Sequence, residues 1–333
     1  MQDVPVWDHP TPQDFARDIA PLARPAIMRG IAGDWPLVQL ARQSDAACMT
    51  ALARFASDEP IDVVRTAPEN EGRFHYSDDV RGVNFARAKA SLPAFLHALE
   101  LEARKDRPCA MSAQGVLARL AVPDFATSHP MPYAPASADP RLWIGNAAKV
   151  ASHNDPSDNV AVCAAGRRRF TLFPPDQIGN LYIGPLHFTP AGTPISMVHV
   201  TNPDLLRYPR FANALAAAWV AELEPGDALF IPYAWYHHVE ALEPFNILVN
   251  YWWNDARSEL GSPWDAMLHG MMSLRSLPAD QRSAWRAMFD HYVFLENGDP
   301  AAHLPNHVHG VMGASSPADI VSMKLQLKEI FSK

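Results

Sequence analysis

The chain has 333 residues, of which 48% are hydrophobic, and its formal net charge is −8. This net negative charge argues against a protein that binds nucleic-acid phosphates electrostatically, so we expect no nucleic-acid partner. Cys48, Cys109 and Cys163 lie far apart and form no CxxC pair, which excludes a disulfide framework or a zinc knuckle. We find no signal peptide pattern and no apolar stretch near the ~20 residues of a membrane span, so we expect a soluble cytoplasmic protein without membrane contact.

The first 108 residues mix helices with a few strands. Thr11-Pro12 followed by Asp14 predicts a helix start, because threonine is a good N-cap and proline suits the first helical position. We therefore expect an N-terminal α/β segment over residues 1–108. Its further patterns predict helices at 44–56 and 91–101 and strands at 24–30 and 61–66.

From residue 109 the patterns change to strands separated by Gly, Pro, Asn and Asp clusters. Apolar residues on both faces of these strands predict a closed barrel or a double-sheet jelly roll, which leaves few exposed edges. We assign 109–255 to this core and 256–333 to a C-terminal helical region. The predicted strands are 141–145, 149–155, 160–164, 167–173, 218–223, 228–231, 237–241 and 247–253, and the predicted C-terminal helices are 263–274, 278–293 and 317–331.

His153 and Asp155 are the first candidate metal ligands. If residues 149–155 are extended, both side chains point to the same side of the strand, because side chains alternate with a period of two. His237 would complete two histidines and one carboxylate on one face of a metal, which is diagnostic of non-haem Fe(II) oxygenases. The tripeptide alone is a weak signal, since a histidine in an apolar strand is more often structural than a ligand.

Arg168 shares one face of its predicted strand with Phe170 and Leu172. If that face lines the barrel, a guanidinium enters an apolar interior, which is costly without a carboxylate partner. A dicarboxylic co-substrate would supply that partner, with its keto-acid end on the metal and its far carboxylate on Arg168.

Short collinear pieces between Trp143 and Trp253 carry a family resemblance. They include His153-Asn-Asp155, Phe173-Pro-Pro-Asp-Gln177, Pro225-Gly-Asp227, Trp235-Tyr-His237-His238 and Val249-Asn-Tyr-Trp252. In these pieces the chain resembles the cupin-like JmjC oxygenases, and most closely asparaginyl hydroxylases of the factor-inhibiting-HIF type. The resemblance implies a mainly β fold with helices, namely a double-stranded β-helix of the jelly-roll or cupin type.

The resemblance also implies Fe(II) as the metal and 2-oxoglutarate as the co-substrate. Arg168 falls where the family usually has a lysine that binds the distal carboxylate; this keeps the charge but changes the geometry. No catalytic residue beyond the metal ligands is implied. The matched positions are the iron ligands His153, Asp155 and His237, the amides Asn159 and Asn250 near the co-substrate, and Trp252 at the substrate pocket.

Three departures from the family pattern concern the pocket. Val150 replaces a hydroxyl residue that helps hold the co-substrate, and Met111 falls where a tyrosine contributes another hydroxyl. Ile195 stands where a glutamine positions the target asparagine. Retained metal ligands with altered pocket residues favour the same chemistry on a different substrate.

We therefore expect an Fe(II)- and 2-oxoglutarate-dependent oxygenase that hydroxylates a protein side chain, with a small molecule or a methylated residue as alternative substrates. The competing hypotheses are a non-catalytic regulatory cupin that binds a ligand or a metal, and a metal-dependent cupin with another chemistry. An apolar stripe through Trp285, Met288 and Phe289 would suit a homodimer formed by the C-terminal helices, or packing against the barrel.

Overall fold

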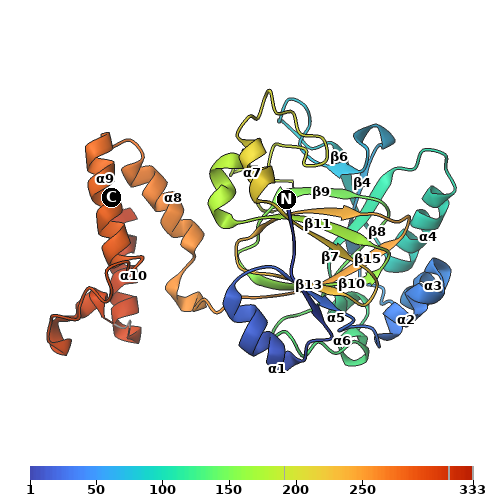
Figure 1. The fold of residues 1–333 in the computed structure, drawn as a ribbon, viewed down its shortest axis with the longest axis horizontal. Helices are drawn as coiled ribbons and strands as arrows, with labels where there is room; N and C mark the ends of the chain where they lie inside the picture. Colours follow the sequence, from blue (N-terminus) through green and yellow to red (C-terminus); the bar gives the residue numbers. More distant parts are fainter. Residues whose placement is uncertain (191, 314–315, 332–333) are drawn as a thin grey trace. The chain divides into compact units, whose positions relative to one another are not determined.

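Two mixed β-sheets form the framework of residues 1–254 (Figure 1). In hydrogen-bonding order, the six-stranded sheet contains β1 (Gln2–Asp3), β12 (Trp219–Leu223), β11 (Arg168–Phe173), β14 (Tyr236–Ala241), β9 (Lys149–His153) and β5 (Arg73–Phe74). The nine-stranded sheet contains β2 (Val6–Asp8), β3 (Ala26–Arg29), β13 (Ala228–Ile231), β10 (Asp158–Ala165), β15 (Asn246–Trp253), β8 (Arg141–Gly145), β7 (Ala110–Leu117), β4 (Ile61–Thr66) and β6 (Phe85–Ala90). This architecture confirms the predicted mainly β, jelly-roll class of fold.

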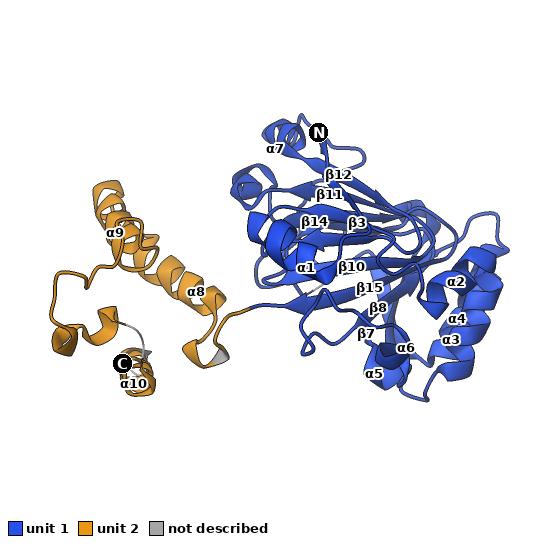
Figure 2. Ribbon diagram, turned by 60° about the horizontal axis from the view of Figure 1, so that its bottom comes forward, with its two compact units in different colours: residues 1–254 blue, residues 255–333 orange. Residues whose placement is uncertain are grey.

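The computed structural model describes residues 1–190, 192–313 and 316–331, which divide into two units, 1–254 and 255–333 (Figure 2). Strands from both sides of residue 108, β4 and β7, pair with each other in one sheet. The N-terminal segment therefore completes the same sheet as the core. The three-part division of the chain at 108 and 255 stays a prediction.

The eight predicted core strands all form, with one correction. The strand predicted over 149–155 ends at His153, so Asp155 lies in the turn that follows β9. Pro156 comes next and has no backbone N–H to donate to a ladder, so regular strand pairing does not continue past this point. Asp155 therefore reaches the site from a turn rather than from the alternation of a strand.

The space between the two sheets is filled by apolar side chains from both of them. Phe170, Leu172 and Val239 come from the six-stranded sheet, and Leu229 and Leu248 come from the nine-stranded sheet. The strand β10 is buried along most of its length, which explains its unbroken apolar run from Val160 to Ala165.

The N-terminal helices cover the other face of the nine-stranded sheet. A second core cluster joins Val38, Leu52 and Phe95 from three of these helices to Val160 and Ile247 of the sheet. The helices of this unit are α1 (Pro12–Asp14), α2 (Pro36–Gln43), α3 (Asp45–Phe55), α4 (Leu92–Ala103), α5 (Ala118–Ala121), α6 (Phe125–Ser128) and α7 (Phe211–Ala217). The predicted start of α1 is confirmed, since Thr11 and Asp14 form a reciprocal capping box.

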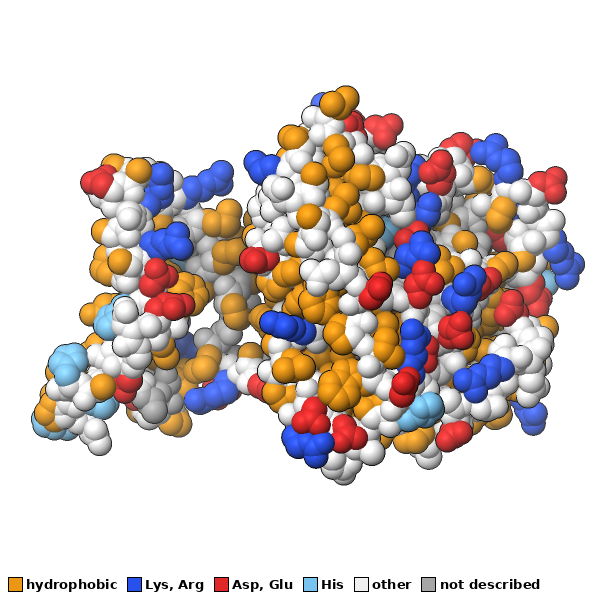
Figure 3. Space-filling view, in the orientation of Figure 1, with side chains coloured by type: hydrophobic (Ala, Val, Ile, Leu, Met, Phe, Trp, Pro, Cys, Tyr) orange, Lys and Arg blue, Asp and Glu red, His pale blue; other side chains and the backbone are white. Residues whose placement is uncertain are grey.

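Residues 255–333 contain the three predicted C-terminal helices, α8 (Pro263–Leu274), α9 (Ala279–Tyr292) and α10 (Pro317–Phe331). Trp264, Met267, Trp285 and Met288 are exposed on α8 and α9. Among the described residues, no helix is both long enough and apolar enough to cross a bilayer. On the visible face of the molecule, lysine and arginine side chains lie among acidic ones rather than in a separate patch (Figure 3).

The packing predicts the cost of a cavity in the wall that carries the site. Ile144, in the middle of β8, is fully buried in the larger core cluster. Ile144→Ala should lower the free energy of unfolding by about 2–5 kcal/mol, and the smaller Ile144→Val change by about 1 kcal/mol. Urea unfolding curves measure both, and equal stability of the two variants would contradict this packing.

Candidate metal centre

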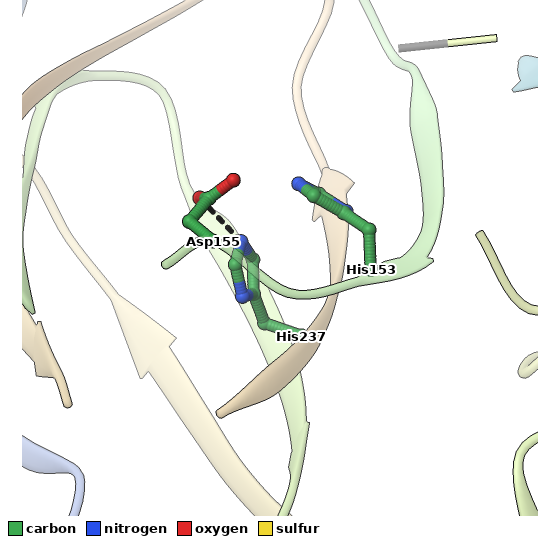
Figure 4. Close-up of side chains that lie close together, drawn as sticks. All are labelled: His153, Asp155 and His237. Carbon is green, nitrogen blue, oxygen red and sulfur yellow. Dashed lines mark ion pairs between the residues drawn. The ribbon is translucent and has the colours of Figure 1, made fainter. Parts of the chain in front are cut away.

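The structure brings together the three side chains that the sequence singles out as metal ligands. His153 ends β9, Asp155 lies in the following turn and His237 lies on β14. One potential ligand atom from each lies within 4.8 Å of the others. His237 Nε2 is 3.7 Å from Asp155 Oδ2, and the two imidazole centroids are 4.3 Å apart (Figure 4). The polar ends of all three converge on one point.

An irregularity in the β9–β14 pairing helps to build this arrangement. His237 lies opposite His153, but Val239 lies opposite Val150, so the register shifts by one residue between these pairs. Such a bulge redirects side chains and is common next to active sites. Here it allows Val150 and His153 to line the same cavity although strict alternation would separate them.

Both imidazoles are held by their own backbone. Nδ1 of His153 lies 2.9 Å from the carbonyl oxygen of Ala151, and Nδ1 of His237 lies 3.1 Å from that of Trp235. A carbonyl oxygen only accepts, so Nδ1 carries the proton in each ring and Nε2 keeps its lone pair. This is the tautomer and support that a metal-binding histidine needs.

The third group is a carboxylate that the protein leaves unsatisfied. Asp155 Oδ2 is buried and has no hydrogen-bond partner within the described residues. Burial lowers the pKa of His237, and the nearby His153 lowers it further, so the imidazole is neutral at physiological pH. Two neutral nitrogen donors and a bare carboxylate oxygen fit a divalent cation.

A cavity of about 120 Å³ opens beside the triad. Its lining includes the triad and the four residues to which the resemblance gave a co-substrate or substrate role, namely Arg168, Asn159, Asn250 and Trp252. The functional roles of these residues stay predictions, but the structure places all of them around one cavity. The lining also includes Ser112, Gln114, Trp143, Asn146 and Thr193, which the sequence did not single out.

Arg168 is buried without a counter-charge. Arg168 is 7% exposed, and no carboxylate in the described part of the chain forms an ion pair with it. Nε has no hydrogen-bond partner, and Nη2 is 3.5 Å from the backbone oxygen of Trp143. Burial lowers the pKa of Arg168 to about 10, so the guanidinium is still charged at neutral pH. This leaves a cation in the cavity that requires an anionic ligand.

The two amides and the tryptophan belong to one corner of the cavity. Asn250 Nδ2 donates to Asn159 Oδ1 at 2.8 Å, which leaves Asn250 Oδ1 buried without a partner. The Trp252 ring meets the Trp143 ring edge-on at 6.1 Å, and the Arg141 guanidinium lies 5.7 Å from the Trp252 centroid. The Trp252 indole N–H also lacks a partner within the described chain.

The three departures from the family pattern have different positions. Val150 lines the cavity and offers no hydroxyl there. Met111 does not line it but packs against the larger core cluster, while its neighbour Ser112 faces the cavity. Ile195 is buried and forms an isolated β-bridge with His153. The assignment of Met111 to a pocket position is therefore wrong, because adjacent residues of β7 face opposite ways.

His238 faces away from the triad, as its position next to His237 predicts. It lines a separate small pocket with His75 and His199. Sequence reasoning missed Ser112, Gln114 and Trp143 because they look like ordinary strand residues. Ser112 and Gln114 lie two residues apart on one strand, and Trp143 precedes a buried isoleucine. Only the pairing of β7, β8 and β15 identifies which of their faces lines the cavity.

Comparison with known proteins gives a family match over most of the chain. A family model described as a cupin-like domain matches residues 12–259. The lysine-specific demethylase JMJ31 of Arabidopsis thaliana is 35% identical over 113 residues, which are 34% of this chain and 20% of that protein. The match therefore spans about a fifth of that relative's length.

Two further relatives match over longer segments. The HSPB1-associated protein 1 homolog of Danio rerio is 26% identical over 258 residues, 73% of this chain and 54% of that protein. The tRNA wybutosine-synthesizing protein 5 of Danio rerio is 28% identical over 279 residues, 77% of each chain. None of these three names refers to an asparaginyl hydroxylase.

Burial of neutral histidines predicts how stability depends on pH. Burial lowers the pKa of His238 to about 4, whereas an unfolded histidine titrates near 6.5. Between these values the unfolded chain binds more protons, so the free energy of unfolding of the metal-free protein should fall as the pH falls. His238→Gln should reduce this slope by up to one proton in urea unfolding from pH 7 to 4. An unchanged slope would contradict the burial of a neutral imidazole there.

Proposed function

We propose that this chain, which belongs to the cupin-like domain family, is an Fe(II)- and 2-oxoglutarate-dependent oxygenase that hydroxylates a protein side chain. The observation that carries the proposal is one cavity lined by two groups of side chains with complementary chemistry. At one place are the Nε2 atoms of two histidines and an unsatisfied carboxylate oxygen, and at another is a buried guanidinium without a counter-charge. A keto acid that chelates a metal held by the first group, and whose second carboxylate pairs with the guanidinium, would complement both.

His153, Asp155 and His237 would hold the metal through one face. Three protein ligands would leave room on the metal for the keto acid and dioxygen. When bound, iron and 2-oxoglutarate supply the oxidation: dioxygen and the keto acid give succinate and CO₂, and one oxygen atom enters a substrate C–H bond. The protein's own task is to fix the ligands, since Ala151 and Trp235 orient both imidazoles.

Arg168 would bind the distal carboxylate of 2-oxoglutarate. Its planar fork can donate two parallel hydrogen bonds, which the lysine usual at this position cannot do. The free Oδ1 of Asn250 and its bond to Asn159 would orient the co-substrate from the facing strands. Trp252, at the corner of the same cavity, is the proposed contact for the substrate.

A protein substrate is the choice that several features favour together. One relative is named a lysine-specific demethylase, and the acidic chain shows no separate basic patch on the face in Figure 3. Another relative's name refers to tRNA, so a substrate that contains a nucleoside is the contrasting outcome. The exposed apolar residues of α8 and α9 support the proposal of a homodimer, and we propose a cytoplasmic location.

A regulatory cupin without turnover is the second candidate. Val150 favours it, because this residue offers no hydroxyl to the cavity it lines. Such a protein would bind metal or ligand without producing succinate.

Loss of the carboxylate ligand tests the proposed chemistry. Asp155→Ala should weaken Fe(II) binding more than about 100-fold. Even the loss of a group that only hydrogen-bonds to a metal ligand weakens metal binding about 10–100-fold. Succinate formation from 2-oxoglutarate, iron and dioxygen should then disappear. The control Asp176→Ala removes an exposed carboxylate outside the cavity and should change neither quantity. Full metal affinity in Asp155→Ala, or no succinate from the unaltered protein, would contradict the proposal.

The arginine has a matched control on its own strand. Arg168→Ala should weaken 2-oxoglutarate binding roughly 30-fold or more, because a buried charge would lose its partner, while metal binding is retained. Arg169→Ala removes an exposed arginine paired with Glu222 at 2.6 Å and should leave co-substrate binding unchanged. Calorimetric titration of each variant with 2-oxoglutarate in the presence of Mn(II) measures the two affinities. Equal affinities of the two variants would show that the co-substrate does not reach Arg168.

A further inference from the structure

We propose that the indole N–H of Trp143 is a second hydrogen-bond donor to the distal carboxylate of the co-substrate, beside Arg168. This inference rests on the proposed function and concerns a residue that the family resemblance did not single out. It starts from the donors that a buried carboxylate needs. A carboxylate has two oxygens and about four lone-pair positions, and in a buried site each oxygen needs a donor. Val150, at the position where the family has a hydroxyl, supplies none.

The backbone of Trp143 lies beside Arg168 at the cavity wall. Both side chains line the same cavity, and Arg168 Nη2 is 3.5 Å from the backbone oxygen of Trp143. Trp143 is on β8 of one sheet and Arg168 is on β11 of the other, so the two residues face each other across the space between the sheets. A carboxylate bound beside the guanidinium would therefore share one cavity with the indole.

The indole nitrogen is available for that contact. Trp143 Nε1 is buried and has no hydrogen-bond partner among residues 1–190, 192–313 and 316–331. A buried tryptophan N–H normally finds a partner, and it can only donate, so an anion is the complementary ligand. Ser112, the nearest hydroxyl-bearing neighbour on β7, is directed instead to the carbonyl oxygen of Ala113 at 3.4 Å.

The ring is also held in place before any ligand binds. Its edge-on contact with Trp252 has a centroid distance of 6.1 Å and an interplanar angle of 80°. On another side, a Cβ built on Gly115 would lie 3.8 Å from Trp143 Cζ2, so the ring packs along β7 at van der Waals distance. A donor fixed by packing loses little entropy when it binds, which favours a positioning role.

The test removes the N–H and keeps the ring. Trp143→Phe is titrated with 2-oxoglutarate and, separately, with 2-oxopentanoate, which has the same keto-acid end but no distal carboxylate; Mn(II) replaces iron in both. We expect the Kd for 2-oxoglutarate to rise about tenfold, the scale of one hydrogen bond to a charged group, and the Kd for 2-oxopentanoate to stay unchanged. The control Trp253→Phe, whose ring packs against Phe230 outside the cavity, should change neither.

Each other outcome overturns the inference in a recognisable way. If the unaltered protein binds 2-oxoglutarate and Trp143→Phe binds it equally well, the N–H does not contact the co-substrate, so this inference fails while the proposed function stands. If both ligands weaken equally, the substitution has altered the cavity shape, which thermal unfolding of the variant will also show. If the unaltered protein does not bind 2-oxoglutarate, the proposed function fails and this inference fails with it.

Discussion

The pairing of β9 with β14 is the constraint on which the site depends. It places His153 opposite His237, and the shift in register beside them directs Val150 into the same cavity. Each imidazole is then fixed by the backbone carbonyl oxygen two residues earlier in the chain. Because these orienting bonds are local, the nitrogen donors are prepared by the sheet itself, and a metal would find them in place.

The cavity concentrates polar atoms that the protein leaves unsatisfied. Asp155 Oδ2, Arg168 Nε, Asn250 Oδ1 and the two indole nitrogens of Trp143 and Trp252 are all buried without partners in the described part of the chain. Folded proteins rarely tolerate such groups, since each costs about 1–3 kcal/mol. Their grouping in one cavity indicates that ligands complete them. One cation, one bare carboxylate, one amide oxygen and two neutral donors together support the proposal of a metal and an oxo-acid.

Much of this arrangement could be predicted from residue order. The apolar strands with their turn residues gave the class of fold, and alternation along β11 placed Arg168 with Phe170 and Leu172, as the structure has it. Two features were out of reach. Asp155 enters from a turn beyond the strand, and the bulge on β9 breaks the alternation that would have hidden Val150. Met111 was assigned to the pocket through the family pattern, but the pairing of β7 turns Ser112 inward instead. Such choices of face depend on long-range pairing, which no local pattern contains.

We propose that His153, Asp155 and His237 bind one metal and leave the rest of its coordination sphere open. A crystal structure with Mn(II), which does not react with dioxygen as iron would, tests it most directly. We predict a single ion bound by Nε2 of His153, Nε2 of His237 and one carboxylate oxygen of Asp155, with every other position taken by water or by added 2-oxoglutarate. An ion enclosed by a fourth protein ligand, or one bound elsewhere while this cavity stays without metal, would contradict the account.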